Sequence, residues 1–351
     1  MPGANVSDRS DRYRLAPQMQ AYDNVWTVVA PYVTFITKPD FRSEIFNTDA
    51  NGFRLSHSQF GVVDSISWWQ SEAKGIVLGS SFVFGVGATH DRHTLVSELN
   101  SITGNSFLNL GIRSANSTQE LMASIPFLAK SKYVIICSGI NNLTTNLQSI
   151  GRNELFGPFF GEECYETFAQ YDLAELENLI ESSLAKINWQ VLIKEWWSRL
   201  RRKISRSRSH PDIHQGGAYH ETHLSQSVER ALEKQVRDLL IIARSIPSGS
   251  QLIFVAQPFA EYSRSQPTAE EQRLFEITDK LQSSNWQILK MYLGKLWPQM
   301  VAGLEKVCNF EKITFLDLNK VELTGWCFVD RVHMTDNGYF QVAQAIAAEI
   351  I

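Results

Sequence analysis

Cysteine is scarce in this sequence of 351 residues, which has only four, and none lies near another at the short spacing of a metal or redox site. They are Cys137, Cys164, Cys308 and Cys327. Isolated cysteines of this kind are typical of a reducing compartment, in which thiols stay reduced. Cys137 lies in an apolar run, where we expect a small buried side chain rather than a reactive one.

Long apolar runs and an excess of either charge are missing as well. No stretch approaches the ~20 apolar residues that a membrane-spanning helix needs. Residues 1–14 are polar and lack the apolar core of a secretory signal. Lys and Arg number 33 against 37 Asp and Glu, so the net charge is only −4. We therefore expect a cytoplasmic protein that does not bind nucleic acid.

From residue 74 onward, short apolar runs alternate with helical patterns. Strands are expected at 75–79, 106–110, 132–138, 251–257 and 313–317, and helices at 94–102, 117–130, 229–245, 268–302 and 336–350. This alternation predicts a five-stranded parallel sheet with helices on both faces. Residues 25–65, which precede it, favour irregular β-rich structure. We therefore expect an N-terminal β-rich extension at 1–72 and a main domain at 73–351.

The first expected strand runs directly into Gly79-Ser80-Ser81. A strand that ends in Gly-x-Ser suggests a sharp turn that holds a hydroxyl at the carboxyl edge of the sheet. Open α/β sheets place their chemistry along that edge. Alone the motif is weak, because loops are rich in glycine and serine, but further motifs follow it downstream.

The last expected strand is followed by Asp330-Arg331-Val332-His333. Asp-x-x-His brings a carboxylate and an imidazole onto one short loop, where Asp330 can accept a hydrogen bond from the ring of His333. That bond would leave the other ring nitrogen to take a proton from a serine hydroxyl. The pattern favours Ser81 as a nucleophile and His333 as its base.

Two further segments offer hydrogen-bond donors for a developing oxyanion. Gly111 follows the second expected strand, and the sequence Gly139-Ile140-Asn141-Asn142 follows the third. A glycine lets a backbone amide approach a reacting carbonyl closely, and an asparagine side chain adds a second donor.

These four blocks together resemble the SGNH (GDSL-type) hydrolase family, and they extend over residues 75–339. The resemblance implies Ser81 as nucleophile, His333 as base oriented by Asp330, and an oxyanion hole made by the Ser81 amide, the Gly111 amide and Asn141. It also implies a three-layer α/β/α sandwich with a flavodoxin-like sheet, and the strand pattern independently predicts five strands.

The sequence departs from the family pattern twice. Ser80 and Asn142 stand where the family usually has aspartate, so two supporting carboxylates are replaced by neutral polar groups. The segment Asn51-Gly52-Phe53-Arg54 resembles an element of relatives that act on polysaccharides, although Asn-Gly is also a common hairpin turn. We therefore consider Arg54, Ser80 and Asn142 as candidate substrate-binding residues.

Residues 151–228 interrupt the alternation and are too many for a simple connection. They begin acidic, continue as a helical pattern and end in the basic, tryptophan-containing segment 194–208. We expect a helical cap over the site with a flexible basic loop. The alternatives are a docking helix for a membrane surface or an anionic polymer, and a solvated elaboration. The histidines at 210, 214, 220 and 223 lie in a loop without a carboxylate or cysteine pattern, so no metal site is expected.

The pattern as a whole predicts a serine esterase that needs no cofactor or metal. We expect the substrate to be a small molecule or carbohydrate that carries a small, acetyl-like O-acyl group. An O-acyltransferase with the same triad and a sugar acceptor is one alternative. A non-catalytic binding or scaffold protein on the same fold is another.

Overall fold

The computed structural model describes residues 6–25, 27–70, 74–148, 157–160, 221–264, 266–281 and 286–350. Contacts divide the chain into two compact units, one formed by 1–159 with 224–351 and the other by 160–223. Most of the predicted insertion at 151–228 lies outside the described residues, including the segment 194–208 and the side chains of the four histidines. The expected cap and its alternatives therefore stay predictions.

Five parallel strands form the central sheet, in the order β6-β5-β7-β8-β9. They are β5 Lys74–Gly79, β6 Ser106–Gly111, β7 Tyr133–Ser138, β8 Gln251–Ala256 and β9 Thr314–Asp317. Each strand predicted from the sequence is confirmed to within one residue at either end. The strand order reverses beside β5, which is the place where open α/β sheets form their binding crevice.

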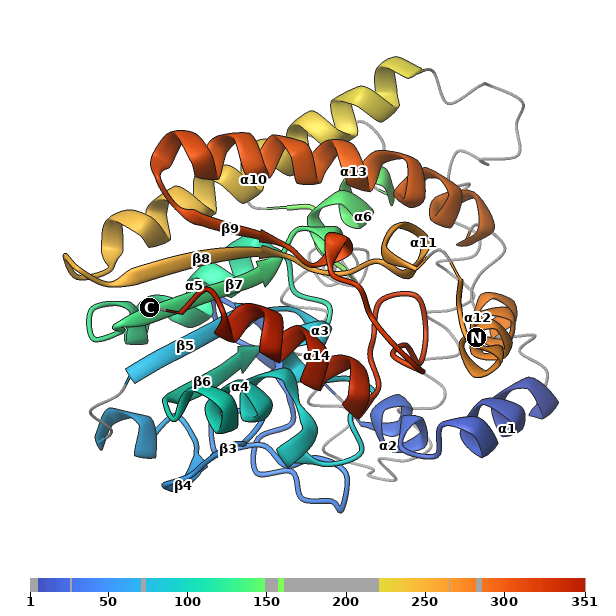
Figure 1. The fold of residues 1–351 in the computed structure, drawn as a ribbon, viewed down its shortest axis with the longest axis horizontal. Helices are drawn as coiled ribbons and strands as arrows, with labels where there is room; N and C mark the ends of the chain where they lie inside the picture. The colour runs from blue at the N-terminus through green and yellow to red at the C-terminus, as the bar shows by residue number, and fades with distance from the viewer. Residues whose placement is uncertain are drawn as a thin grey trace, which may run out of the picture. The chain divides into compact units, whose positions relative to one another are not determined.

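Helices cover both faces of this sheet, so the prediction of a three-layer α/β/α sandwich is confirmed. On one face lie α4 Leu95–Thr103 and α14 Asp336–Ala347, side by side in Figure 1. Their apolar residues share one core cluster with strand residues such as Val77, Ile135 and Ile253. Thr335 caps α14 as its sequence predicts, because its side chain accepts a hydrogen bond from the Gly338 amide.

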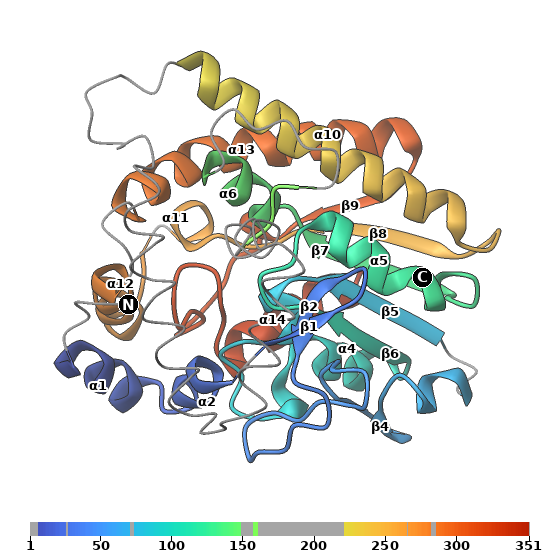
Figure 2. The same cartoon turned by 180° about the vertical axis from the view of Figure 1, so that it is seen from behind.

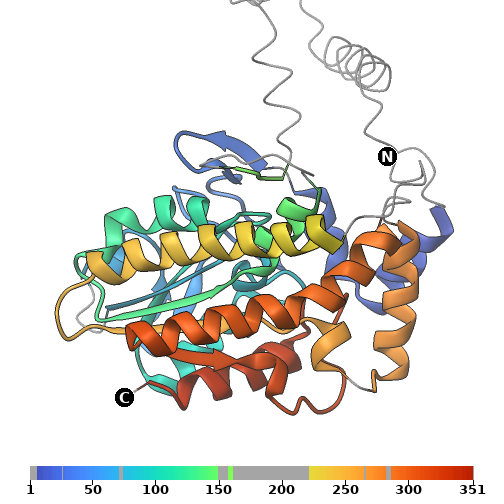
Figure 3. The same cartoon turned by 90° about the horizontal axis from the view of Figure 1, so that it is seen from above.

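The opposite face carries α5 Ser117–Leu128, α10 Glu221–Ser245 and α13 Trp286–Glu311 (Figure 2). A capping box starts α5: the Asn116 side chain accepts from the Gln119 amide, and the Gln119 side chain accepts from the Asn116 amide. Helices α10 and α13 run side by side (Figure 3), and a Cβ placed on Gly303 would lie 2.6 Å from the side chain of Leu232.

The prediction of a single helix at 268–302 is wrong, because the structure has two helices in this region. They are α12 Ala269–Leu281 and α13, which continues to Glu311. The sequence between them is Gln282-Ser283-Ser284-Asn285, whose serines and asparagine favour caps and turns over helix interiors. The shorter elements of this half are α6 Ile140–Gln148, α11 Ala260–Ser263 and the 3₁₀ turn η3 Leu318–Lys320.

The N-terminal region forms two small hairpins within the expected β-rich stretch, β1 Thr27–Ala30 with β2 Thr34–Thr37 and β3 Ser56–Ser58 with β4 Gly61–Val63. It also has the helices α1 Val6–Leu15 and α2 Met19–Asn24 and the turn η1 Ser67–Gln70, none of which the sequence pattern indicates. Helix α1 has few apolar residues and contacts α12, so tertiary packing rather than periodicity selects it. Residues 1–72 belong to the same compact unit as the sheet.

Gly79 offers a test of the close packing at the end of β5. A Cβ there would lie 2.4 Å from the Val83 side chain and 2.5 Å from the Cys137 backbone oxygen, which cannot move freely. We expect Gly79→Ala to lower the free energy of unfolding in urea by about 1–3 kcal/mol. The matched control is Gly294→Ala in α13, where the nearest atom lies 3.7 Å away. Equal effects of the two substitutions would contradict this account.

Candidate active site

Ser81 lies where β5 turns into the four-residue helix α3 Ser81–Phe84. The three residues after Ser81 are buried, whereas Ser81 itself is half-buried. Gly85 ends the helix at φ +87°, a left-handed conformation that glycine adopts without strain, and its amide donates to the carbonyls of Ser81 and Phe82. The apolar side chains anchor the turn while the Ser81 hydroxyl stays at the carboxyl edge of the sheet.

His333 and Asp330 lie on the loop before α14, which is closed by a bridge between Phe328 and Met334. His333 Nε2 lies 2.7 Å from Ser81 Oγ, and His333 Nδ1 lies 2.8 Å from Asp330 Oδ2. Asp330 Oδ1 also accepts from the backbone amides of Val332 and His333. The structure therefore brings together a hydroxyl, an imidazole and a carboxylate in one hydrogen-bonded line.

Asp330 is held as a carboxylate by its surroundings. Burial alone would raise its pKa, but the charge and hydrogen bond of His333, the charge of Arg12 and the Val332 amide together lower the pKa to about 2. Arg12 comes from α1, and its Nη2 lies 3.9 Å from Asp330 Oδ2. Sequence reasoning missed Arg12, because nothing in a polar N-terminal segment indicates which distant carboxylate it will meet.

Glu271 is a second residue that the sequence did not indicate. Its Oε1 accepts from the backbone amides of Cys327, 2.8 Å away, and of Phe328, 3.1 Å away, at the start of the loop that carries His333. Its Oε2 accepts from Arg264 Nε, 3.0 Å away, and the Glu271 side chain is fully buried. In sequence Glu271 resembles an ordinary acidic residue in the first turn of a helix, and only its burial distinguishes it.

Asn141 lies in the first turn of α6, directly after β7, and is half-buried. Because β5 and β7 are neighbouring parallel strands, Ser81 and Asn141 follow adjacent carboxyl ends of the sheet. Asn141 Nδ2 donates to the carbonyl of Ala115, 2.8 Å away, on the loop after β6. A side-chain amide carries two donor hydrogens, so this bond occupies one of them.

The structure corrects the role expected of Gly111. Its amide donates to the side-chain oxygen of Asn109, 2.9 Å away, so that the donor is already engaged. A Cβ at this position would lie 2.1 Å from the Phe84 backbone nitrogen. Gly111 is therefore a glycine because α3 packs directly on the end of β6. The prediction that its amide lines an oxyanion hole is wrong.

The three candidate substrate-binding residues are all buried. Arg54 is fully buried, with its guanidinium turned into the protein. Ser80 and Asn142 are each 3% exposed. The side chains of Arg54 and Asn142 are engaged by protein groups, so they are not free to contact a ligand, and the substrate-binding prediction for these two is wrong. For Ser80 it stays a prediction.

Asn142 belongs to a polar chain that reaches α10. Its side chain accepts from the Ser117 amide at 2.9 Å and donates to the Ser117 hydroxyl at 2.7 Å. That hydroxyl donates to the buried carboxylate of Asp238, 2.6 Å away, and Arg237 pairs with the same carboxylate. A carboxylate is thus present behind the turn, although it comes from another helix.

Within the described ranges, no three His, Cys, Asp or Glu side chains gather as a metal ion would require. No helix in the described part of the chain is long and apolar enough to span a membrane.

No protein-family model and no curated protein sequence match this chain. Solved structures resemble its fold. A carbohydrate acetylesterase family member from Sinorhizobium meliloti is 10% identical, with 79% of this chain and 96% of that chain covered and a TM-score of 0.42. An extracellular lipase from Streptomyces rimosus is 13% identical over 78% and 99%, with a TM-score of 0.41. An aryl esterase from M. smegmatis is 12% identical over 79% and 97%, with a TM-score of 0.40.

The lowered pKa of Asp330 predicts a pH dependence of stability. Because the pKa of Asp330 in the folded chain is about 2, below the ~3.9 of an ordinary aspartate, the ionised carboxylate stabilises the fold above about pH 4, and this stabilisation is lost as the pH falls toward 2. We expect the difference in unfolding free energy between the native chain and Asp330→Asn to shrink over that range. Urea unfolding of both at several pH values measures it, and a constant difference would contradict the prediction.

Proposed function

We propose that this chain is an ester hydrolase of the SGNH type, with Ser81 as the nucleophile, His333 as the base and Asp330 as the residue that orients it. One observation carries the proposal: the hydrogen-bonded line from Ser81 Oγ through His333 to Asp330, with distances of 2.7 and 2.8 Å. This is the arrangement that serine hydrolysis requires, and it lies at the carboxyl edge of the sheet.

The proposed reaction proceeds in two halves. Asp330 fixes the ring so that Nδ1 carries a hydrogen and Nε2 is free to accept the Ser81 proton, after which Ser81 Oγ attacks the ester carbonyl. His333 then returns the proton to the departing alcohol and leaves an acyl group on Ser81. Water, deprotonated by the same imidazole, hydrolyses that acyl-enzyme and regenerates the hydroxyl.

The negative charge that develops on the carbonyl oxygen needs donors. Asn141 supports this role, because its side chain retains an N–H beyond the one bound to Ala115. The Ser81 amide is the second proposed donor, and among the described residues no acceptor is bonded to it. Preorganised donors of this kind stabilise the transition state more than the substrate.

For the substrate we propose a small O-acyl group, such as acetyl, on a carbohydrate. The carbohydrate is proposed from the resemblance of the segment 51–54 to an element of polysaccharide-active relatives. The buried Arg54 takes no part in binding the substrate under this proposal. A purely structural scaffold has no need for an imidazole held between a serine hydroxyl and a carboxylate, which favours the enzyme.

A fluorophosphonate probe tests the assignment of the triad. We expect one label per chain, located at Ser81 by peptide mapping, and loss of that label in His333→Ala, because the hydroxyl is a weak nucleophile without its base. Ser80→Ala is the control for the neighbouring serine and should keep the label. Among p-nitrophenyl esters of increasing chain length, the acetyl ester should be hydrolysed fastest. Mass analysis of the products formed with and without an added sugar shows whether water or a sugar hydroxyl accepts the acyl group. Labelling that survives in His333→Ala would refute the proposal.

Asn141→Ala tests the oxyanion donor separately. We expect kcat for p-nitrophenyl acetate to fall by roughly 10²-fold, the usual effect of removing one such donor, while KM changes little. The circular dichroism spectrum should be unchanged. If kcat were retained, Asn141 would serve only to hold the Ala115 loop.

A further inference from the structure

Six successive backbone carbonyls behind Ser81 each accept a hydrogen bond from a side chain. Residues 83–88 leave α3 and form the loop after it. The donors are Asn109 to Val83, Arg54 to Phe84, Arg54 and Tyr22 to Gly85, Tyr339 to Val86, Gln18 to Gly87 and Tyr22 to Ala88. Loop carbonyls are usually satisfied by water or by turns, so this segment is held in place by side chains from distant parts of the sequence.

Arg54 makes the central contacts of this arrangement. Its Nη1 donates to the carbonyls of Phe84 at 3.1 Å and Gly85 at 2.8 Å, which are the last residue of α3 and its cap. The rings of Tyr22, Phe46 and Phe84 surround the guanidinium, with their centroids 5.5–5.6 Å from Cζ. A buried arginine in such a setting must have its donors satisfied, and these carbonyls satisfy them.

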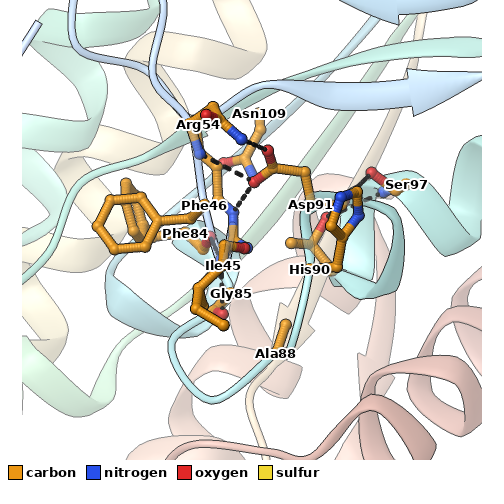
Figure 4. Close-up of polar contacts among 12 residues, drawn as sticks. Ile45, Phe46, Arg54, Phe84, Gly85, Ala88, His90, Asp91, Ser97 and Asn109 are labelled. Atoms are coloured by element: carbon orange, nitrogen blue, oxygen red, sulfur yellow. Dashed lines mark hydrogen bonds and ion pairs between the residues drawn. The ribbon is translucent and has the colours of Figure 1, made fainter. Parts of the chain in front are cut away.

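Asp91 fixes the guanidinium from the other side. Arg54 Nε donates to Asp91 Oδ1 at 2.8 Å, and Figure 4 shows the two side chains pointing toward each other. The other oxygen, Oδ2, accepts from the Asn47 side chain at 2.7 Å, and Asp91 is as buried as Arg54. Because both partners are anchored, the guanidinium has little freedom to move with the carbonyls that it binds.

The held segment is linked to both Ser81 and the loop that carries His333. Helix α3 has only four residues, so a shift of its last carbonyls also moves Ser81 at its start. Two residues beyond its cap, a Cβ on Gly87 would lie 2.3 Å from the Met334 carbonyl oxygen, adjacent to His333. The segment that Arg54 holds is therefore in direct contact with the loop that carries the base.

We propose that Arg54, fixed by Asp91, is a positioning residue that sets the place of Ser81 relative to His333. The inference rests on the proposed function, since it assigns to Arg54 an effect on the reactivity of Ser81. It requires the forked geometry of a guanidinium and not charge alone. An ammonium group is a compact point charge, which cannot reach Asp91 and two carbonyls in the same fixed geometry.

Arg54→Lys tests this directly, because it keeps the charge beside Asp91 and removes the fork. At a temperature where circular dichroism shows the variant folded, we expect kcat for p-nitrophenyl acetate to fall by roughly 10²-fold, the scale of a 1 Å misplacement of a reacting group. KM should change by less than about twofold, because no substrate contact is lost. The rate of fluorophosphonate labelling at Ser81 should fall with kcat.

A control for lost stability is Leu252→Ala, a buried residue near the amino end of β8, opposite to the edge where Ser81 lies. It should lower the melting temperature and leave kcat and the labelling rate of the folded protein unchanged. Should Arg54→Lys fail to fold, Tyr22→Phe removes one hydroxyl, which accepts from Arg54 Nη1 at 2.8 Å and shares its single hydrogen between the Gly85 and Ala88 carbonyls. We expect it to lower kcat and the labelling rate roughly fivefold, the effect of about one lost hydrogen bond.

The outcomes separate the inference from the proposed function. If the native chain is labelled at Ser81 and the folded Arg54→Lys or Tyr22→Phe variant reacts at the native rate, the positioning role is refuted and the esterase stands. An equal loss of kcat in Leu252→Ala would also refute it, since stability alone would explain the effect. A native chain that neither hydrolyses esters nor takes the label would overturn the proposed function, and the inference with it.

Discussion

The hydrogen bond between Ser81 Oγ and His333 Nε2 joins two residues that are 252 positions apart in sequence, and most of the described site serves to hold one end of it or the other. Short loops carry both residues, and a loop does not fix a side chain to within a few tenths of an ångström by itself. The precision comes from the surrounding structure. Packing against β6 and the carbonyl contacts of residues 83–88 hold the Ser81 end, and Glu271 and Asp330 hold the His333 end.

Buried ion pairs recur around this bond. They are Arg54 with Asp91, Arg264 with Glu271 and Arg12 with Asp330. The first and the last of these pairs join segments that are far apart in sequence. Pairs of this kind are weak contributors to net stability, because the cost of desolvating the charges offsets their attraction. Their geometry, however, is restrictive, since a buried charge that loses its partner is costly. The N-terminal segment thereby becomes part of the site.

Ser80 and Asn142 stand where the family that this sequence resembles usually has aspartate, and the two residues have different surroundings. Asn142 donates a hydrogen bond to the Ser117 hydroxyl, which in turn donates to the carboxylate of Asp238 on α10. The carboxylate behind the β7 turn therefore comes from α10, which begins in the last part of the insertion. Ser80 is buried directly before Ser81, and the contacts that hold the Ser81 turn come instead from Arg54, Tyr22 and Asn109.

The sequence by itself determined the five strands, most of the helices and the short-range motifs of the site, because these depend on neighbouring residues: apolar runs, caps, Gly-x-Ser and Asp-x-x-His. It did not show that Arg54 is buried, that the Gly111 amide is engaged by Asn109, or that α1 brings Arg12 to Asp330. Only the tertiary structure decided these points, since each depends on which distant segments meet. A local pattern records what a residue can do, whereas burial and partners settle which of its possible roles it takes.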